Sequence, residues 1–373
     1  MTQDGAHGTL ADIGEFGLIE RITGDVPASP AVPVGPGDDA AVVVAADGRV
    51  VVTCDVLVEG KHFRRDWSTP IDVGRKAAAA SLADIAAMGA TATSLVVGFG
   101  APADLPAAWA VACTAGLREE SALVGATLVG GDVVEAPQIV ISVTALGDLA
   151  GRPPVLRSGA QVGDTVAVAG RLGWSGAGLA LLSRSFRSPR VLVEAHRFPQ
   201  PPYAAGPAAA AAGATSMVDV SDGLVADAGH VAAASGVRLA LESGALEVAE
   251  PLQSAAAAFN TDPLIWILGG GEDHALLANP WTTGAQDATT AHAVIHAIAE
   301  SFGIDDAFVI PAYEDPLVGI VADVRRPAGE PPEHDVDAAA PTDEGTAAAF
   351  VSARDHTEVT PVGWVLPLHA HGA

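Results

Sequence analysis

The chain has 373 residues, of which 49% are hydrophobic, and it carries a formal net charge of −26. This length and apolar content predict a globular protein of two domains and exclude a disordered one. The strong negative charge argues against nucleic acid and anionic membranes as partners, because both bind positively charged surfaces.

The first half of the chain alternates between strand-like and helix-like runs. Short β-branched runs predict strands at 40–45, 51–55, 93–100 and 137–149. Helices are predicted at 68–89 and at about 105–123. The first of these helices has Ser68 or Thr69 as a cap, Pro70 in its first turn and Gly89 at its end.

A turn-rich stretch near Gly151 separates the two halves, so we expect an N-terminal domain at 1–150 and a C-terminal α/β domain at 151–373. The second half predicts a strand at 165–170, a helix at 174–182, and a strand, turn and helix across 216–236. The run LIWILGGGEDHALLA, at 264–278, predicts a strand, a glycine turn and a second strand. Pro, Asp and Ala dominate an irregular insertion near 322–358.

The expected location is the cytoplasm. No apolar run is long enough to cross a bilayer, and the N-terminal residues lack the basic start and apolar core of a signal peptide. Cys54 and Cys113, the two cysteines, are too few for a disulfide framework and lack the spacing of zinc ligands. These features predict a reduced protein without a membrane segment.

Acidic residues gather at the ends of apolar runs and beside glycines. An Asp after a strand is ordinarily a turn former or a helix cap, and this structural role stays open for each acid taken alone. Asp84 is different, because its helix is almost entirely apolar and small, and a buried carboxylate without a partner costs several kcal/mol. The acids concerned are Asp38, Asp39, Asp55, Asp84, Asp132, Asp219, Asp222, Glu272 and Asp273.

Together these acids indicate a site for a hard cation. Magnesium prefers carboxylate oxygens and typically binds one or two of them together with substrate phosphates. Adjacent side chains of an extended strand point to opposite faces, so we expect Asp38 and Asp39 to hold different magnesium ions. The alternative is an Asx-type turn with one carboxylate in solvent.

Two nucleotide-binding motifs are excluded. The segment GPGDDA, at 35–40, matches the GxGxxA fingerprint formally, but it precedes a strand pattern and places two anions where phosphates would lie. A Walker A loop requires GxxxxGK[ST], whereas the Gly60–Lys61 pair is followed by His62. A P-loop kinase is therefore excluded.

Eight segments, in order from Gly14 to about Leu277, resemble the thiamine-monophosphate kinase family. That family belongs to the superfamily of aminoimidazole ribonucleotide synthetase and selenophosphate synthetase. Each motif is weak alone, but the ordered series is specific. The segments are GEFGLIERI, GPGDDAAVV, TCDVLVEGKHF, SLADIAAMGA, GGDVV, RSGAQVGD, VDVSDGLVADAGHVA and GGGEDHALL.

The resemblance implies an α/β (α+β) fold of two domains, with the N-terminal sheet forming the core of a homodimer and ATP near that interface. It implies ATP-dependent phosphorylation of thiamine monophosphate to thiamine diphosphate, by direct in-line transfer, in thiamine diphosphate biosynthesis. Several magnesium ions would neutralise the repulsion between the two phosphate groups. No general base is expected, because the acceptor phosphate oxygen is already ionised at neutral pH.

The resemblance also implies roles for particular residues. The implied metal ligands are Asp38, Asp39, Thr53, Cys54, Asp55, Asp84, Asp132, Asp219 and Asp222. The implied ATP contacts are Gly131, Asp132, Arg157 and Ser221, and the implied substrate contacts are His62, Glu272 and Trp364.

The chain departs from the family pattern at three places. Cys54 stands where a hydroxyl residue is common, so a metal contact there would come from its backbone carbonyl. The family often has an aromatic residue against the nucleotide where this chain has Cys113 or Thr114. Trp364 lies in an unusual C-terminal segment, where apolar packing is as much expected of it as substrate contact.

Other functions remain open. The chain resembles neither a selenophosphate synthetase, which needs a reactive Cys or selenocysteine with a lysine near the N-terminus, nor a hydrogenase-maturation protein, which ends in a reactive cysteine. The alternatives are a non-catalytic magnesium–nucleotide binding protein, another ATP-dependent synthetase of the superfamily, and an acidic structural protein.

Overall fold

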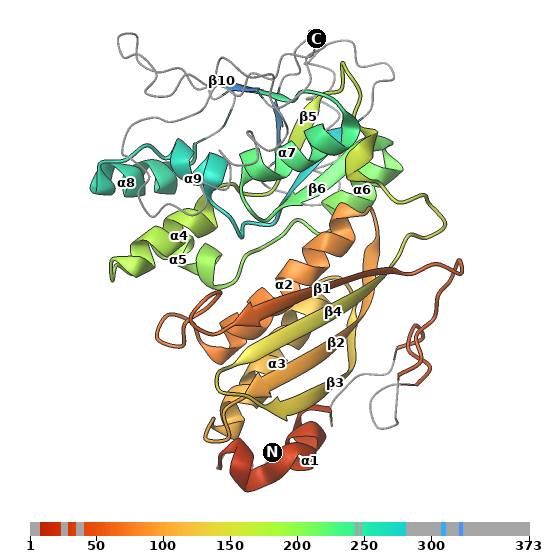
Figure 1. The fold of residues 1–373 in the computed structure, drawn as a ribbon, viewed down its shortest axis with the longest axis vertical. Helices are drawn as coiled ribbons and strands as arrows, with labels where there is room; N and C mark the ends of the chain where they lie inside the picture. Colours follow the sequence, from red (N-terminus) through yellow and green to blue (C-terminus); the bar gives the residue numbers. More distant parts are fainter. Residues whose placement is uncertain are drawn as a thin grey trace. The chain divides into compact units, whose positions relative to one another are not determined.

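The computed structural model describes residues 8–23, 29–34, 41–242, 246, 248–280, 307–310 and 321–323. The chain divides into two compact units (Figure 1). Unit 1 comprises Met1–Pro154 and Arg197–Pro199, and unit 2 comprises Val155–His196 and Gln200–Ala373. No helix in the described part of the chain is long and apolar enough to cross a membrane.

Unit 1 is built on a four-stranded sheet with the order β1-β4-β2-β3. β4 pairs antiparallel with both β1 and β2, whereas β2 and β3 run parallel. The strands are β1 (Val51–Val58), β2 (Thr91–Ala101), β3 (Thr127–Glu135) and β4 (Val140–Asp148). The strand predicted at 40–45 is wrong over its described residues, because only an isolated bridge joins Val42 to Val34 there.

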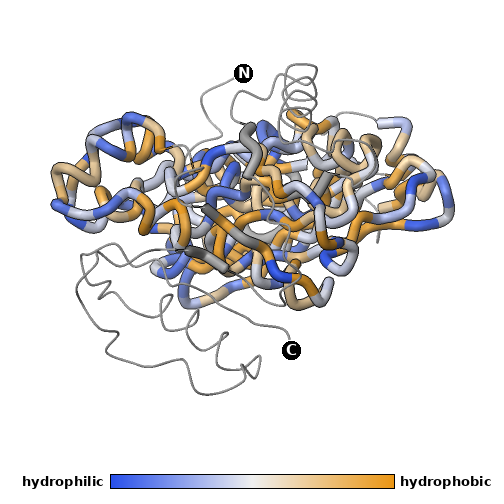
Figure 2. The backbone as a smooth tube through the Cα atoms, turned by 90° about the horizontal axis from the view of Figure 1, so that it is seen from above, coloured by the Kyte–Doolittle hydropathy of each residue, from blue (hydrophilic) through white to orange (hydrophobic). Residues whose placement is uncertain are grey.

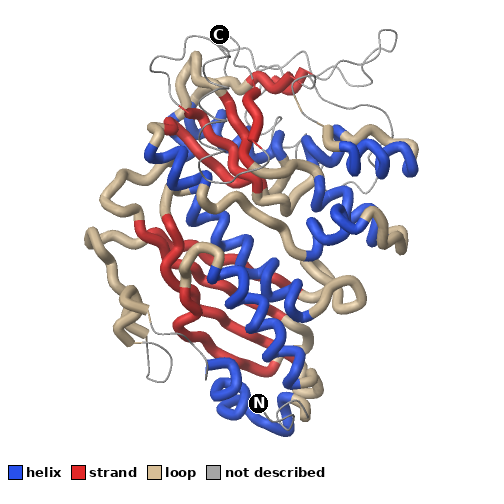
Figure 3. Tube along the Cα trace, turned by 180° about the vertical axis from the view of Figure 1, so that it is seen from behind, coloured by secondary structure: helices blue, strands red, loops and turns tan. Residues whose placement is uncertain are grey.

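Two helices cover one face of this sheet, α2 (Pro70–Ala87) and α3 (Ala107–Ala122), as Figure 3 shows from behind. Their predicted positions are confirmed. Thr69 caps α2 and forms a capping box with Asp72, and Gly89 follows the helix with a φ of 76°. The remaining helix of the unit is α1 (Leu10–Thr23).

Small residues let α2 and α3 pack closely. A Cβ atom at Gly74 of α2 would collide with the carbonyl oxygen of Cys113, and one at Gly116 of α3 would collide with that of Ile71. All alanines of α2 except Ala80 are buried, and Figure 2 shows the hydrophobic residues along the described backbone. This packing holds α2 against β1. Each of the two elements carries one predicted site acid, Asp84 on α2 and Asp55 on β1.

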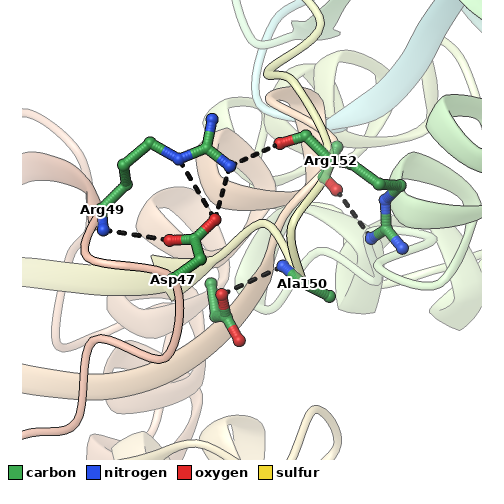
Figure 4. A network of polar contacts seen from close by, with 6 residues as sticks. Asp47, Arg49, Ala150 and Arg152 are labelled. Carbon is green, nitrogen blue, oxygen red and sulfur yellow. Dashed lines mark hydrogen bonds and ion pairs between the residues drawn. The ribbon is translucent and has the colours of Figure 1, made fainter.

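A polar network fastens the segment before β1 to the turn after β4 (Figure 4). The guanidinium of Arg49 donates to Asp47 and, over 3.0 Å, to the carbonyl oxygen of Arg152. The Arg152 guanidinium in turn donates to the carbonyl oxygen of Gly89. The backbone N–H of Ala150 donates to Asp148, so the turn is held from both sides.

Unit 2 combines a four-stranded sheet of order β6-β8-β5-β9 with a separate parallel pair, β7 and β10. The strands are β5 (Val166–Ala169), β6 (Ala214–Val220), β7 (Ala240–Glu242), β8 (Ala275–Pro280), β9 (Ala307–Ile310) and β10 (Val321–Asp323). The helices are α4 (Trp174–Ser183), α5 (Arg190–Arg197), α6 (Ala205–Ala211), α7 (Leu224–Ser235), α8 (Glu250–Phe259) and α9 (Leu264–Gly269), with a 3-10 turn η2 (Arg157–Gly159).

Both units mix helices with sheets, which confirms the predicted α/β (α+β) class. The strands predicted at 165–170 and within 216–236 are present as β5 and β6, and the helices as α4 and α7. The first strand predicted within 264–278 is wrong, because these residues form α9. A short apolar run is compatible with a buried strand or a buried helix, so its pattern alone does not decide between them.

Candidate active site

Two of the predicted acids of unit 1, Asp55 and Asp84, lie at the contact between β1 and α2. Thr53 and Asp55 are two residues apart on β1, so their side chains share the face that α2 covers. The Thr53 hydroxyl donates to Asp84 of α2, with 2.5 Å between Oγ1 and Oδ2. Asp55 accepts from the hydroxyl of Ser81, with 2.8 Å between Oγ and Oδ2. One strand and one helix therefore hold both carboxylates.

Ser81 is a site residue that the sequence did not predict. It is fully buried, and its hydroxyl also lies 3.0 Å from the carbonyl oxygen of Val143. Ser81 and Asp84 are three residues apart and therefore lie on one face of α2. This spacing is the signal in the sequence that places Ser81 beside Asp84.

The oxygen donors at this contact fit magnesium. Carboxylate and hydroxyl oxygens are hard ligands, which suit magnesium better than zinc or copper. The described residues contain no group of three or more His, Cys, Asp and Glu side chains placed to hold a metal ion. Asp55 and Asp84 could supply the one or two carboxylates that magnesium typically takes from a protein when phosphates complete its shell.

Cys54 and Asp132 lie on the opposite face of the sheet. The thiol of Cys54 lies 3.3 Å from the hydroxyl of Ser142, and both side chains lie on the face away from α2. Asp132 pairs through Gly98 with Ser142, so it shares that face and is exposed. Within one chain the structure does not bring Asp132 together with Asp55 and Asp84.

Gly131 has a structural reason to be glycine. A Cβ atom there would collide with the carbonyl oxygen of Val97 on β2. The close approach of β2 and β3 therefore requires glycine at this position, whatever it contributes to nucleotide binding.

His62 is held in one tautomer. Its Nδ1 accepts the backbone N–H of Val58 at 2.9 Å, so Nδ1 carries no proton and Nε2 is the protonated nitrogen of the neutral ring. The Lys76 ammonium is buried and donates to the carbonyl oxygen of His62 at 2.9 Å. The imidazole is exposed, which leaves Nε2–H available to an acceptor outside the chain.

In unit 2 the turn after β6 packs against the glycine turn before β8. The backbone N–H groups of Glu272 and His274 donate to the carbonyl oxygens of Ser221 and Val220, over 2.7 and 3.0 Å. Gly271 lies so close that a Cβ atom there would be 2.5 Å from the carbonyl oxygen of Ser221. The sequence motifs VDVSDG and GGGEDH therefore form one structure.

Asp219 points into this structure. Its carboxylate is buried, and its Oδ2 lies 3.1 Å from Nδ1 of His274. The His274 backbone has a φ of 50°, which few residues with a side chain adopt. His274 is a second site residue that the sequence did not predict, although it stands inside the quoted motif GGGEDH.

Asp227 holds the turn that carries Asp222. Its Oδ2 accepts the backbone N–H of Asp222 at 2.9 Å. Burial raises the pKa of Asp227 to about 7, with smaller contributions from the charges of Asp219 and Asp222, while the Asp222 N–H and the charge of Arg157 act in the opposite direction. Arg157, on η2, thus lies close enough to Asp227 to act on its charge.

Asp273 is bound to the first turn of α4. Its two carboxylate oxygens accept the backbone N–H groups of Gly173 and Ser175, at 2.6 and 2.7 Å. Complete burial raises the pKa of Asp273 to about 7, although both N–H groups and the charge of His274 lower it. A residue from a distant part of the sequence therefore caps this helix.

Three implied contacts lie outside the described residues, namely Asp38, Asp39 and Trp364. The insertion predicted near 322–358 also lies there, except for its first two residues in β10. Cys113 is buried within α3, where burial raises the pKa of its thiol to about 12, and the Thr114 hydroxyl donates to the carbonyl oxygen of Ala110.

Comparison with family models gives three matches. The N-terminal domain of AIR synthase related proteins matches residues 37–149, and the C-terminal domain of the same group matches residues 161–280. A model described as a putative amidoligase enzyme (DUF2126) matches residues 264–373, which overlap the second match at 264–280.

The chain is similar to thiamine-monophosphate kinases in sequence and structure. It is 56% identical to the thiamine-monophosphate kinase of Mycobacterium tuberculosis over 271 residues, which cover 72% of this chain and 81% of the relative. It is 27% identical to the crystal structure of this kinase from Stenotrophomonas maltophilia K279a, with a TM-score of 0.69 over 81% of this chain and 93% of that one. It is 30% identical to AaThiL complexed with AMPPCP and TMP, with a TM-score of 0.63 over 84% and 94%. The chain therefore belongs to the thiamine-monophosphate kinase family.

Proposed function

We propose that this protein transfers the γ-phosphoryl group of ATP directly to thiamine monophosphate, giving thiamine diphosphate and ADP in thiamine diphosphate biosynthesis. The observation that carries the proposal is the 56% identity with a thiamine-monophosphate kinase over 81% of that relative. The structural likeness to AaThiL complexed with AMPPCP and TMP supports a nucleotide and a thiamine phosphate as ligands.

The acids of each unit would hold magnesium. In unit 1 the ligands would be Asp55 and Asp84, with Thr53 beside them, and in unit 2 they would be Asp219 and Asp222; Asp38 and Asp39 would add to these. Bound magnesium would neutralise the charge that accumulates where two phosphate groups approach each other. Ser81 and Thr53 support this assignment, because their hydroxyls fix the orientation of the two carboxylates.

The other residues would bind and orient the two substrates. His62 would donate its Nε2–H to a phosphate oxygen, as its fixed tautomer allows. Arg157 would bind ATP phosphates with its exposed guanidinium, and Ser221 and Gly131 would contact the nucleotide. Glu272 would meet the cationic ring of thiamine, and Trp364 would cover the substrate.

We further propose that residues 1–150 form the dimerisation domain of a homodimer. The sheet face away from α2 and α3 carries exposed valines at positions 52, 56, 96 and 134, and a second copy of this chain would cover them. Asp132 and Cys54 share this face, so the same interface would bring Asp132 near a site of the partner.

Sedimentation should show a dimer, with Cys54 protected from maleimide; a monomer with a reactive Cys54 contradicts the dimer proposal.

The proposed location is the cytoplasm. The two cysteines form no disulfide in the structure, since Cys54 is exposed and Cys113 is buried as a free thiol. This state suits a reducing compartment.

Incubation with ATP, Mg²⁺ and thiamine monophosphate tests the catalytic proposal. Chromatography of the products should show thiamine diphosphate and ADP in equal amounts. ATP binding without turnover would indicate the alternative, a magnesium–nucleotide binding protein. Hydrolysis of ATP to ADP and inorganic phosphate without thiamine diphosphate would indicate another synthetase of the superfamily.

A further inference from the structure

Several contacts within unit 2 hold the backbone and the side chain of Glu272 in place. The Glu272 backbone has a φ of 65°, and its N–H donates to the carbonyl oxygen of Ser221 at 2.7 Å. The next residue, Asp273, binds the first turn of α4 through Gly173 and Ser175. The backbone on both sides of the Glu272 side chain is therefore held firmly.

His196 connects the same turn of α4 to the Glu272 carboxylate. Its Nδ1 lies 3.2 Å from the hydroxyl of Ser175 and 3.7 Å from Oε2 of Glu272. The first distance is that of a hydrogen bond, whereas the second is too long for one and places the ring nitrogen beside the carboxylate oxygen. His196 and Ser175 are buried, whereas a third of the Glu272 side chain is exposed, at 33%. One nitrogen of a buried ring thus faces both the helix and the carboxylate.

This arrangement restrains a carboxylate that is otherwise only partly buried. A glutamate has three rotatable side-chain bonds, and ordering it costs up to about 2 kcal/mol of side-chain entropy. A buried ring packed beside one carboxylate oxygen narrows the conformations open to the side chain and lowers the part of this cost that falls on ligand binding. A hydrogen bond with the Ser175 hydroxyl holds the ring of His196, so the restraint reaches from α4 to Glu272.

We propose that His196 is a positioning residue that holds the Glu272 carboxylate toward the cationic ring of thiamine monophosphate. This inference rests on the proposed function and on the implied contact between Glu272 and the substrate. His196 itself does not touch the substrate. It sets the affinity for the positively charged part of the acceptor and leaves ATP binding and the transfer step unchanged.

The test compares four variants in steady-state kinetics. His196→Ala should raise the KM for thiamine monophosphate about tenfold, with unchanged kcat and unchanged KM for ATP, because a fixed orientation of a ligand group is typically worth this much. His196→Asn should restore most of the affinity, since its side-chain amide nitrogen lies near the place of Nδ1. His230→Ala, at an exposed histidine of α7, is the matched control. Glu272→Ala should raise the KM for thiamine monophosphate as well. Adding His196→Ala to this variant should then change that KM no further.

A neutral acceptor separates positioning from general destabilisation. In a thiophene isostere of thiamine monophosphate the ring charge is absent, so His196→Ala should leave its KM unchanged. Ser175→Ala, a smaller change in packing, should weaken binding of thiamine monophosphate in the same direction. Equal effects on the charged and neutral acceptors, or on ATP, overturn the inference. A wild-type protein that does not phosphorylate thiamine monophosphate at all refutes instead the proposed function.

Discussion

The hydroxyl of Thr53 on β1 donates a hydrogen bond to the carboxylate of Asp84 on α2, with 2.5 Å between Oγ1 and Oδ2. Asp84 is half-buried, and the helix residues on either side of it, Ala83 and Ile85, are apolar and buried. A neutral hydroxyl compensates only part of the cost of burying a negative charge. The contact therefore orients the Asp84 carboxylate, and the proposed magnesium would meet it in this orientation.

Thr53→Val should raise the Mg²⁺ concentration that gives half-maximal activity by about 10- to 100-fold, because the valine keeps the shape and removes the donor. Thr53→Ser keeps the hydroxyl and should stay within about threefold of the wild type. A magnesium titration of initial rates measures both. Equal magnesium dependence in the three proteins contradicts the role assigned to Thr53.

Asp55→Asn should lower kcat at least about 100-fold, because a neutral amide replaces a charge that acts on the transferred group. The metal-free variant should melt at the same temperature as the wild type or higher, since it removes repulsion between neighbouring acids while Ser81 keeps a partner. Asp66→Asn, at an exposed ion pair with Arg64, is the control and should change neither quantity. Turnover of Asp55→Asn near the wild-type level would refute its assignment.

Asp227→Ala should reduce kcat by about 10- to 100-fold, because the N–H of Asp222 loses its acceptor and the turn is released. Asp227→Asn keeps an acceptor oxygen and should retain most of the activity. The pair of variants is compared by kcat and by melting temperature. If the asparagine variant loses as much activity as the alanine variant, the charge of Asp227 matters and not its hydrogen bond.

The contribution of Asp273 to the stability of the metal-free protein should fall as the pH rises from about 4 to about 7. Asp273 keeps its proton to about pH 7 in the folded state, whereas the unfolded chain releases it near 3.8, so the folded state binds more protons in this range. Urea unfolding at several pH values should show a smaller decline for Asp273→Asn than for the wild type. An identical decline would mean that Asp273 does not titrate in this range.

Much of the fold follows from local patterns. The cap at Thr69, the Pro70 at the start of α2 and the Gly89 after it define a helix that packing does not alter. β3 was not predicted, because Gly130, Gly131 and Asp132 are poor strand residues, and pairing with β2 overrides this preference. The strand prediction fails at α9, since five apolar residues followed by a glycine carry no clear period.

Residue type and family resemblance predict the site residues, but neither predicts the residues that hydrogen-bond to them. Ser81, Asp227 and His274 bind predicted acids, yet each reads in the sequence as an ordinary helix or loop residue. His196 is 76 residues away from Glu272 along the chain, so only the folded unit brings the two together. The opposite orientation of Asp132 and Asp55 depends on the register of four strands and is equally hidden from the sequence.

The stereochemistry of the transfer tests the central claim most directly. ATP made chiral at its γ-phosphorus as a thiophosphate isotopomer is incubated with the protein, Mg²⁺ and thiamine monophosphate, and the configuration of the thiophosphoryl product is determined. Direct in-line transfer predicts inversion at phosphorus. Retention would require a phosphorylated protein intermediate and would contradict the account, as would the absence of any labelled thiamine diphosphate.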